Sequence, residues 1–212
     1  DKSRDKLQFC WLFYYIEYKD RKILIDTGFN NDKLVRMFDI RNFKDPLSLL
    51  SENGVNAENI TDIIITHTHF DHIGNADRFP NARIIINKKE YDSFMKGTGL
   101  SSVRKYLKAN PKVTTFEKSI LFLDFFRIET IGGHTEGSSV IFFNYNNNQY
   151  CIAGDEAYLN DNFTSMIGNG SVVSHNKNIS FIKEIIKSGT KTFIFHDNNY
   201  YDNKQQFIRI IP

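Results

Sequence analysis

The sequence TDIIITHTHFDHIGN, residues 61–75, joins a short apolar run to a dense group of polar side chains. Residues 61–65 have the pattern of a buried strand. Three of the six histidines in the chain and one aspartate follow within six positions, at His67, His69, Asp71 and His72. One histidine alone is most often an ordinary core or surface residue, but chance would produce this pattern only about 0.0004 times in this composition. We therefore interpret the stretch as a metal site at the end of a strand.

The spacing of these four residues divides them between two ions. In an extended segment, side chains two positions apart point to the same side, so His67 and His69 can bind one ion. Asp71 and His72 are adjacent and suit a second ion close by. Two ions about 3.5–4 Å apart can share a bridging hydroxide. Ligands that offer only nitrogen and oxygen atoms suit zinc, and also manganese, iron or cobalt, and zinc is the first choice by base rate.

Further ligands are expected after other predicted strands. His134 lies in GGHTEG, Asp155 lies in YCIAGDEAY, and His196 ends the run KTFIFH. Asp155 has a simpler alternative interpretation, because an aspartate after a strand is often a helix cap. His175 lies in a polar stretch without a strand before it, so we expect it to be an ordinary surface histidine.

Hydrophobic patterning predicts more strands than helices. The predicted strands span residues 9–18, 22–26, 61–65, 82–86, 120–123, 125–130, 138–144, 149–153 and 191–196. The predicted helices span residues 45–55, 88–96, 101–110 and 178–189, and the last one has an apolar stripe at Ile179, Ile182, Ile185 and Ile186. Because helices recur in both halves, we expect two packed sheets with helices outside. The length fits a single domain over residues 1–212.

The composition is that of an ordinary globular protein, with 41% hydrophobic residues, 25% charged residues and a net charge of +2. This charge does not suggest a nucleic-acid partner. No apolar run approaches the ~20 residues that span a membrane, and residues 1–10 lack the apolar core of a signal peptide. A cytoplasmic protein with a small-molecule substrate is therefore expected. Cys10 and Cys151 lie in apolar runs, which predicts buried thiols and no disulfide.

Together these residues resemble the metallo-β-lactamase superfamily, whose hallmark is His-x-His-x-Asp-His followed by a distant His, a bridging Asp and a last His. The matching residues occur in that order, at His67, His69, Asp71, His72, His134, Asp155 and His196. An upstream Asp-Thr-Gly is also typical, and IDTG at residues 25–28 supplies it with Asp26. The resemblance runs from about residue 9 to the C-terminus. It implies an α/β fold, an αββα sandwich of two mixed β-sheets with helices on the outer faces.

The resemblance also implies how the residues divide between two divalent metal ions. The two ligand sets are His67, His69 and His134 for one ion and Asp71, His72 and His196 for the other. Asp155 would bridge both ions. Asp26 would orient a ligand histidine or support its loop.

Within this superfamily the sequence is most similar to the N-acyl-homoserine lactonase-like group. That group has a Tyr three residues after the bridging Asp, which Tyr158 matches, and a closing His-Asp segment, which the tail FHDNNYYDNKQQF at 195–207 resembles. β-Lactamases of this fold usually lack the bridging Asp, and glyoxalase II enzymes carry a long C-terminal helical region. The connection at residues 29–61 is shorter than in the lactonases, so we expect a different acyl site.

The resemblance implies hydrolysis of an ester-type bond, most of all a lactone, by attack of a metal-bridging hydroxide. Asp71 would carry a proton to the leaving group, and Tyr158 would donate a hydrogen bond to the developing oxyanion. A glyoxalase II-like thioesterase or another hydrolase of the fold is an alternative. A rival of another class is a mononuclear iron dioxygenase that uses only His67, His134 and Asp155. A metal-binding sensor without activity is disfavoured by the complete ligand set.

Overall fold

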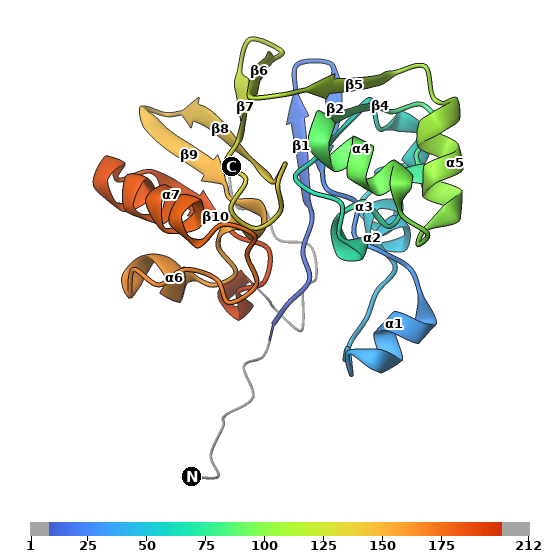
Figure 1. The fold of residues 1–212 in the computed structure, drawn as a ribbon. Coiled ribbons are helices and arrows are strands. Elements are labelled where there is room, and N and C mark those ends of the chain that lie inside the picture. Colours follow the sequence, from blue (N-terminus) through green and yellow to red (C-terminus); the bar gives the residue numbers. More distant parts are fainter. Residues whose placement is uncertain (1–8, 201–212) are drawn as a thin grey trace.

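Two five-stranded sheets face each other, with helices on their outer sides (Figure 1). The computed structural model describes residues 9–200. The first sheet has the order β1 (Tyr14–Tyr18), β2 (Arg21–Ile25), β3 (Asp62–Ile65), β4 (Arg83–Asn87), β5 (Val113–Phe116). The second sheet has the order β10 (Lys191–Phe193), β9 (Asn148–Ile152), β8 (Ser139–Tyr145), β7 (Phe126–Thr130), β6 (Ser119–Phe122). The predicted αββα arrangement is confirmed.

Both sheets mix parallel and antiparallel pairs. In the first sheet, β1 and β2 form an antiparallel hairpin, whereas β2, β3, β4 and β5 pair in parallel. In the second sheet, β10 pairs with β9 in parallel and the remaining pairs are antiparallel. Parallel pairing brings the carboxyl ends of neighbouring strands to one edge, where binding sites of such sheets usually form.

The alternation of side chains along each strand divides the core into layers. In β3, Ile63 packs under the helices of the first half, while Ile64 points between the two sheets. In β8, Val140 packs under α7 (His175–Ser188), while Ile141 points between the sheets. Burying one such side chain completely contributes about 1.5–3 kcal/mol. The central layer therefore joins the two halves that carry the candidate metal ligands.

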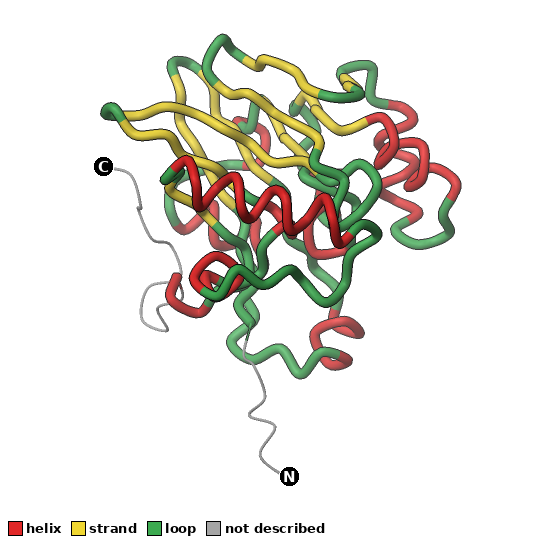
Figure 2. The backbone as a smooth tube through the Cα atoms, turned by 60° about the vertical axis from the view of Figure 1, so that its left-hand side comes forward, coloured by secondary structure: helices red, strands yellow, loops and turns green. Residues whose placement is uncertain are grey.

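Helices and short turns connect the strands. The helices besides α7 are α1 (Asp32–Met37), α2 (Pro46–Glu52), α3 (Phe70–Ile73), α4 (Lys88–Lys96), α5 (Ser101–Ala109) and α6 (Asn160–Thr164). The 3-10 turns are η1 (Ala57–Asn59), η2 (Ala76–Arg78), η3 (Gly154–Glu156) and η4 (Asn198–Tyr200). Figure 2 shows α7 lying across the strands of the second sheet. Within residues 9–200, no helix has both the length and the apolar character needed to cross a membrane.

The helix predicted at 178–189 begins three residues earlier, at His175, and Gly189 ends it in the left-handed region with φ 65°. Its expected apolar stripe is only partly buried, because Ile186 is 40% exposed and Ile179 is half-buried. The buried face consists instead of Asn178, Phe181, Ile182 and Ile185. Phe181 lies on this buried face, but the predicted stripe contained only isoleucines and so left it out.

The strand predicted at residues 9–18 is shorter than expected, since β1 begins only at Tyr14. Residues 10–12 pair with the other half of the molecule: the amide of Cys10 donates to the carbonyl of His196 over 3.1 Å, and that of Leu12 to the carbonyl of Phe195 over 3.2 Å. One apolar run therefore serves both halves, which hydropathy alone does not reveal. The final predicted strand, 191–196, likewise ends at Phe193. Strand β5 and helices α1, α3 and α6 were not predicted, because each is short.

Candidate metal centre

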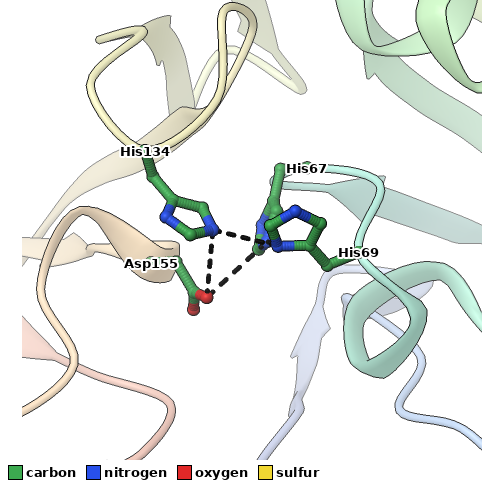
Figure 3. Close-up of side chains that lie close together, drawn as sticks. All are labelled: His67, His69, His134 and Asp155. Carbon is green, nitrogen blue, oxygen red and sulfur yellow. Dashed lines mark hydrogen bonds and ion pairs between the residues drawn. The ribbon is translucent and has the colours of Figure 1, made fainter. Parts of the chain in front are cut away.

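The seven predicted ligand residues come together where strands end. The four strands concerned, β3, β7, β9 and β10, end at Ile65, Thr130, Ile152 and Phe193. Each is followed within a few residues by one or more of the polar side chains. In Figure 3, His67 and His69 come from the loop after β3 and point toward His134 and Asp155, which come from the second half. The site is therefore assembled from both sheets.

The first group consists of His67, His69, His134 and Asp155, whose candidate ligand atoms all lie within 4.8 Å of one another. Nδ1 of His69 is 3.0 Å from Nε2 of His67 and 3.0 Å from Nε2 of His134. Oδ2 of Asp155 lies 3.6 Å from Nε2 of His67 and 3.4 Å from Nε2 of His134. His69 is exposed while the other three are buried, so solvent reaches the group from one side.

The second group consists of Asp71, His72 and His196. Oδ2 of Asp71 is 3.2 Å from Nε2 of His72 and 3.8 Å from Nε2 of His196. Asp71 and His72 both lie in the single turn of α3, which begins directly after His69. That turn carries the chain from the first group to the second.

Asp155 lies between the two groups. Its Oδ2 faces the first group, whereas its Oδ1 is 3.2 Å from Nε2 of His72 and 3.2 Å from Nε2 of His196. One carboxylate thus presents one oxygen to each group. The alternative interpretation of Asp155 as a helix cap does not hold, because Asp155 lies inside η3 and the N-cap position is occupied by Ala153.

Hydrogen bonds at the outer ring nitrogens orient three of the histidines. Nδ1 of His72 is 2.6 Å from Oδ2 of Asp26, Nδ1 of His134 is 2.8 Å from the carbonyl of Ser171, and Nδ1 of His196 is 2.9 Å from the carbonyl of Cys10. Because carbonyl and carboxylate oxygens only accept, each Nδ1 carries the hydrogen. Each Nε2 is therefore the ring nitrogen that faces the centre of the site and is left for a metal ion.

Asp26 supports the site without facing it. It follows β2, is fully buried, and accepts from the amide of Thr66 at 2.8 Å and from the Thr66 hydroxyl at 2.7 Å, besides its bond to His72. It also adopts a left-handed backbone conformation with φ 60°, which is uncommon for a residue other than glycine. The expected contact of Asp26 with a ligand histidine is present.

The charges of the cluster suit a bound cation. Burial, together with His72, holds the pKa of His67 well below its usual range. Burial would lower the pKa of His72 too, but Asp155 and Asp71 outweigh it and raise that pKa well above its usual range. Burial opposes ionisation of Asp155, yet His72 and His196 hold its pKa well below the usual range. Buried carboxylates thus draw positive charge to the place where the two groups meet.

Nε2 of His72, which faces the place where the two groups meet, also fits a metal ion. Nε2 of His72 is fully buried, and no described residue offers it a hydrogen bond of acceptable geometry. A buried nitrogen left without a partner is costly in an apolar setting. Imidazole nitrogens and carboxylate oxygens converge around it, and these are the ligands that zinc and similar divalent ions take in proteins.

A sequence profile described as the Metallo-beta-lactamase superfamily matches residues 12–195. This chain belongs to the metallo-beta-lactamase superfamily. The match covers both sheets and every residue of the two groups except His196, which directly follows its end.

Individual relatives of this superfamily member are distant and differ in their named activities. An exodeoxyribonuclease, WalJ, of Streptococcus pneumoniae is 24% identical over 187 residues, which cover 84% of this chain and 61% of the relative. An N-acyl homoserine lactonase of a Bacillus species is 23% identical over 168 residues, which cover 73% of this chain and 66% of the lactonase. The chain thus spans about three fifths of the length of WalJ.

Solved structures show the same fold. The crystal structure of a quorum-quenching N-acyl homoserine lactone lactonase superposes with a TM-score of 0.76 at 20% identity. The superposition covers 94% of this chain and 84% of that one. At this identity the likeness concerns the metallo-beta-lactamase fold and not the substrate.

Tyr158 lies at the border of the first group. Its ring packs edge-on against His134 and His196, with ring centroids 5.7 and 5.4 Å apart, and its hydroxyl is 3.4 Å from Nδ1 of His134. Burial raises the pKa of the Tyr158 hydroxyl, and the nearby carboxylate of Asp155 raises it further. The hydroxyl therefore remains protonated at neutral pH and is available as a donor.

Two buried carboxylates near the site were not predicted. Glu90 of α4 and Glu156 of η3 hydrogen-bond to the loops that carry the histidines of this metallo-beta-lactamase fold. The glycines of GGHTEG were the available signal, because they mark places where other groups approach the backbone closely. His175 lies on the surface at the start of α7 and belongs to neither group, as expected.

Proposed function

We propose that this chain is a dinuclear metal-dependent hydrolase that opens a lactone or a related ester. The observation that carries the proposal is the placement of Asp155, with one carboxylate oxygen toward each of two ligand groups. His67, His69 and His134 would hold one ion, Asp71, His72 and His196 would hold the other, and Asp155 would join them. Two divalent ions, with zinc as the first choice for nitrogen and oxygen ligands, would supply hydroxide at neutral pH and polarise the carbonyl.

The chain's own residues would direct the rest of the reaction. Tyr158 keeps its proton at neutral pH, so its hydroxyl can donate a hydrogen bond to the oxyanion that develops on the substrate. Burial works against ionisation of Asp71, but His72 lowers its pKa below the usual value, so Asp71 is charged. A charged carboxylate beside the site can accept a proton and pass it to the leaving alkoxide.

Aromatic rings beside the second group favour a substrate with an apolar part. The indole of Trp11 is 5.6 Å from the ring of His196 and also 5.6 Å from each of the rings of Phe38 and Phe70. Phe38 stacks on Phe70 at 5.4 Å while remaining 47% exposed. A half-exposed aromatic surface gains from covering by an apolar group. An acyl chain on the lactone would be such a group.

Phosphodiester hydrolysis is a second candidate because of one specific observation, the match of 84% of this chain to a pneumococcal exodeoxyribonuclease. A pair of ions also suits the in-line displacement at phosphorus. A thioesterase and a mononuclear iron dioxygenase using His67, His134 and Asp155 are further alternatives. The dioxygenase predicts one iron per chain, whereas the hydrolase predicts two ions.

The test is a hydrolysis screen of the zinc-loaded protein combined with metal counting by atomic emission. We expect two ions per chain and turnover of acylated lactones well above that of thioesters, p-nitrophenyl phosphodiesters, single-stranded DNA and β-lactams. The matched control is Asp155→Asn, which keeps the shape of the side chain but cannot serve two cations. Preferred cleavage of DNA would replace the lactonase proposal by the nuclease, and one ion per chain would contradict both.

A further inference from the structure

The loop Gly132–Gly137, which carries His134, is held from two sides by buried carboxylates. Neither carboxylate hydrogen-bonds to the side chain of a candidate metal ligand. Glu90 comes from α4 and Glu156 from η3, and they are 4% and 0% exposed. Within residues 9–200, neither forms an ion pair with a lysine or arginine. A buried carboxylate without a cation needs hydrogen bonds to compensate the loss of water.

Glu90 joins the two loops that supply the first group. Its Oε2 accepts from the amide of Thr68 at 2.9 Å and from the Thr68 hydroxyl at 2.8 Å. Its Oε1 accepts from the Thr135 hydroxyl at 2.6 Å and from the amide of Gly137 at 3.0 Å. Thr68 lies between His67 and His69, and Thr135 follows His134. One side chain therefore links the backbone of the His67/His69 pair to that of His134.

Glu156 holds the same loop from the other side. Its Oε1 accepts from the amides of Gly133 at 2.9 Å and of His134 at 3.0 Å, and Oε2 accepts from Nδ2 of Asn178 at 2.9 Å. Because Glu156 directly follows Asp155, these bonds fix the distance between His134 and the carboxylate that faces both groups.

Glu90 and Glu156 lie so close to the backbone of GGHTEG that two of its positions have room only for glycine. A Cβ at Gly137 would lie 2.4 Å from Oδ1 of Asn87 and 2.9 Å from Cγ of Glu90, and a Cβ at Gly133 would lie 2.3 Å from Oε2 of Glu156. A larger residue at Gly133 would displace the carboxylate of Glu156, and one at Gly137 would press on both Asn87 and Glu90. The spacing of the two glycines around His134 therefore follows from the hydrogen bonding of the loop.

We propose that Glu90 and Glu156 are positioning residues for the loop that carries His134, and that Glu90 sets the distance between His134 and the His67/His69 pair and so tunes metal binding by the first group alone. Neither contacts Asp71, His72 or His196, whose positions depend on α3, Asp26 and Cys10. The inference rests on the proposed metal binding but makes a separate claim, namely that the two groups respond differently to one substitution.

Glu90→Gln is a sharp test because it keeps the volume of the side chain. Each oxygen of Glu90 faces a backbone N–H, Thr68 on one side and Gly137 on the other, and a backbone N–H cannot reverse its direction. In either orientation, the new amide group sets an NH₂ against one of these donors. The matched control on the same helix is Asp92→Asn, whose carboxylate pairs only with Lys88 at the surface.

The measurement is zinc affinity by competition with a chromophoric chelator, together with ¹⁵N chemical shifts of the imidazoles. With His175 exposed on the surface, five histidine signals report on the two groups. In the wild type and Asp92→Asn, we expect all five to shift as two ions bind. In Glu90→Gln, the ion bound by His67, His69 and His134 should bind about 10–100-fold more weakly, while the shifts of His72 and His196 are kept.

Three outcomes would overturn the inference: unchanged binding of both ions by Glu90→Gln, equal weakening of both, or selective loss at His72 and His196. If the wild type does not bind zinc, the proposed function fails and this inference fails with it. If the wild type binds two ions and one of the three outcomes above is found, only this inference fails. If Glu90→Gln does not fold, Thr135→Val removes a single hydroxyl bond to Glu90. It should weaken the first group about fivefold, as expected for one hydrogen bond, and an unchanged affinity would contradict the proposal.

Discussion

Oδ2 of Asp26 lies 2.6 Å from Nδ1 of His72, and both side chains are buried. The same aspartate accepts hydrogen bonds from the amide and the hydroxyl of Thr66, the residue before His67. Asp26 thereby fixes the tautomer of His72 and the start of the loop that carries His67 and His69. A residue at the end of β2 thus orients candidate ligands that are more than forty positions away in the chain.

The Asp26→Asn substitution should reverse the tautomer of His72. The amide oxygen of the new asparagine would still accept a hydrogen bond from the backbone N–H of Thr66. Its NH₂ group would then face Nδ1 of His72, so Nδ1 would have to accept a hydrogen bond. The hydrogen would move to Nε2 and block the lone pair. We expect the second ion to bind at least about tenfold more weakly. Metal counting by atomic emission checks this, and Asp39→Asn, at an exposed side chain, is the control.

Asp155→Ala should abolish binding of both ions and all hydrolysis together. The substitution removes the only carboxylate among the described residues that faces both ligand groups. We expect the loss in kcat/KM to exceed about a hundredfold, with zinc content falling in parallel. Full turnover by this variant would contradict the bridging role.

Tyr158→Phe should lower kcat without changing the zinc content. The hydroxyl lies 3.4 Å from Nδ1 of His134, and Nδ1 already has the carbonyl of Ser171 as acceptor. Loss of one donor to an oxyanion typically costs about 10²–10³ in kcat. Steady-state kinetics on the lactone that the screen selects would measure this. An unchanged kcat would assign Tyr158 a packing role between His134 and His196.

Both cysteines should resist alkylation in the native protein. Burial raises the pKa of Cys10, and the charge of Asp197 raises it further, to about 12; burial also raises the pKa of Cys151 well above its usual range. Thiolate is the reactive form, so iodoacetamide at pH 8 should label the thiols only after denaturation. Because the unfolded Cys10 titrates near 9.0, its contribution to stability is complete below pH 9 and is lost as the pH rises toward 12. Mass spectrometry of native and unfolded samples checks the labelling.

Two isoleucines of α7 should differ strongly in their contribution to stability. Ile182 is fully buried against the second sheet, whereas Ile186 is 40% exposed. Ile182→Ala should lower the free energy of unfolding by about 2–5 kcal/mol, and Ile186→Ala by less than about 1 kcal/mol. Urea denaturation of the two variants measures both values. Equal losses would contradict the buried face assigned to this helix.

Much of the fold could be predicted from residue patterns. The run Ile63-Ile64-Ile65 fills two layers of the core from one strand, and the helix at 88–96 has the predicted bounds. Errors arose where one apolar run serves two partners, as at residues 9–18, and where an aromatic residue replaces an isoleucine on a buried face, as at Phe181. Chain segments far away in the sequence decide which partner each part of such a run meets, and a local pattern contains no information on them. The end of the tail that resembles the lactonases, residues 201–207, lies outside the described residues.

The sequence by itself determined which residue types were available for a two-ion site and the order in which they occur, because ligand chemistry depends on local spacing and on strand ends. Only the tertiary structure decided how they meet. Asp155 lies near His196 because β9 pairs with β10, and Glu90 links two loops because α4 brings its carboxylate within hydrogen-bond distance of Thr68 and Thr135. Such distances are set by packing between segments 20 to 90 residues apart, and no local pattern in the sequence encodes them.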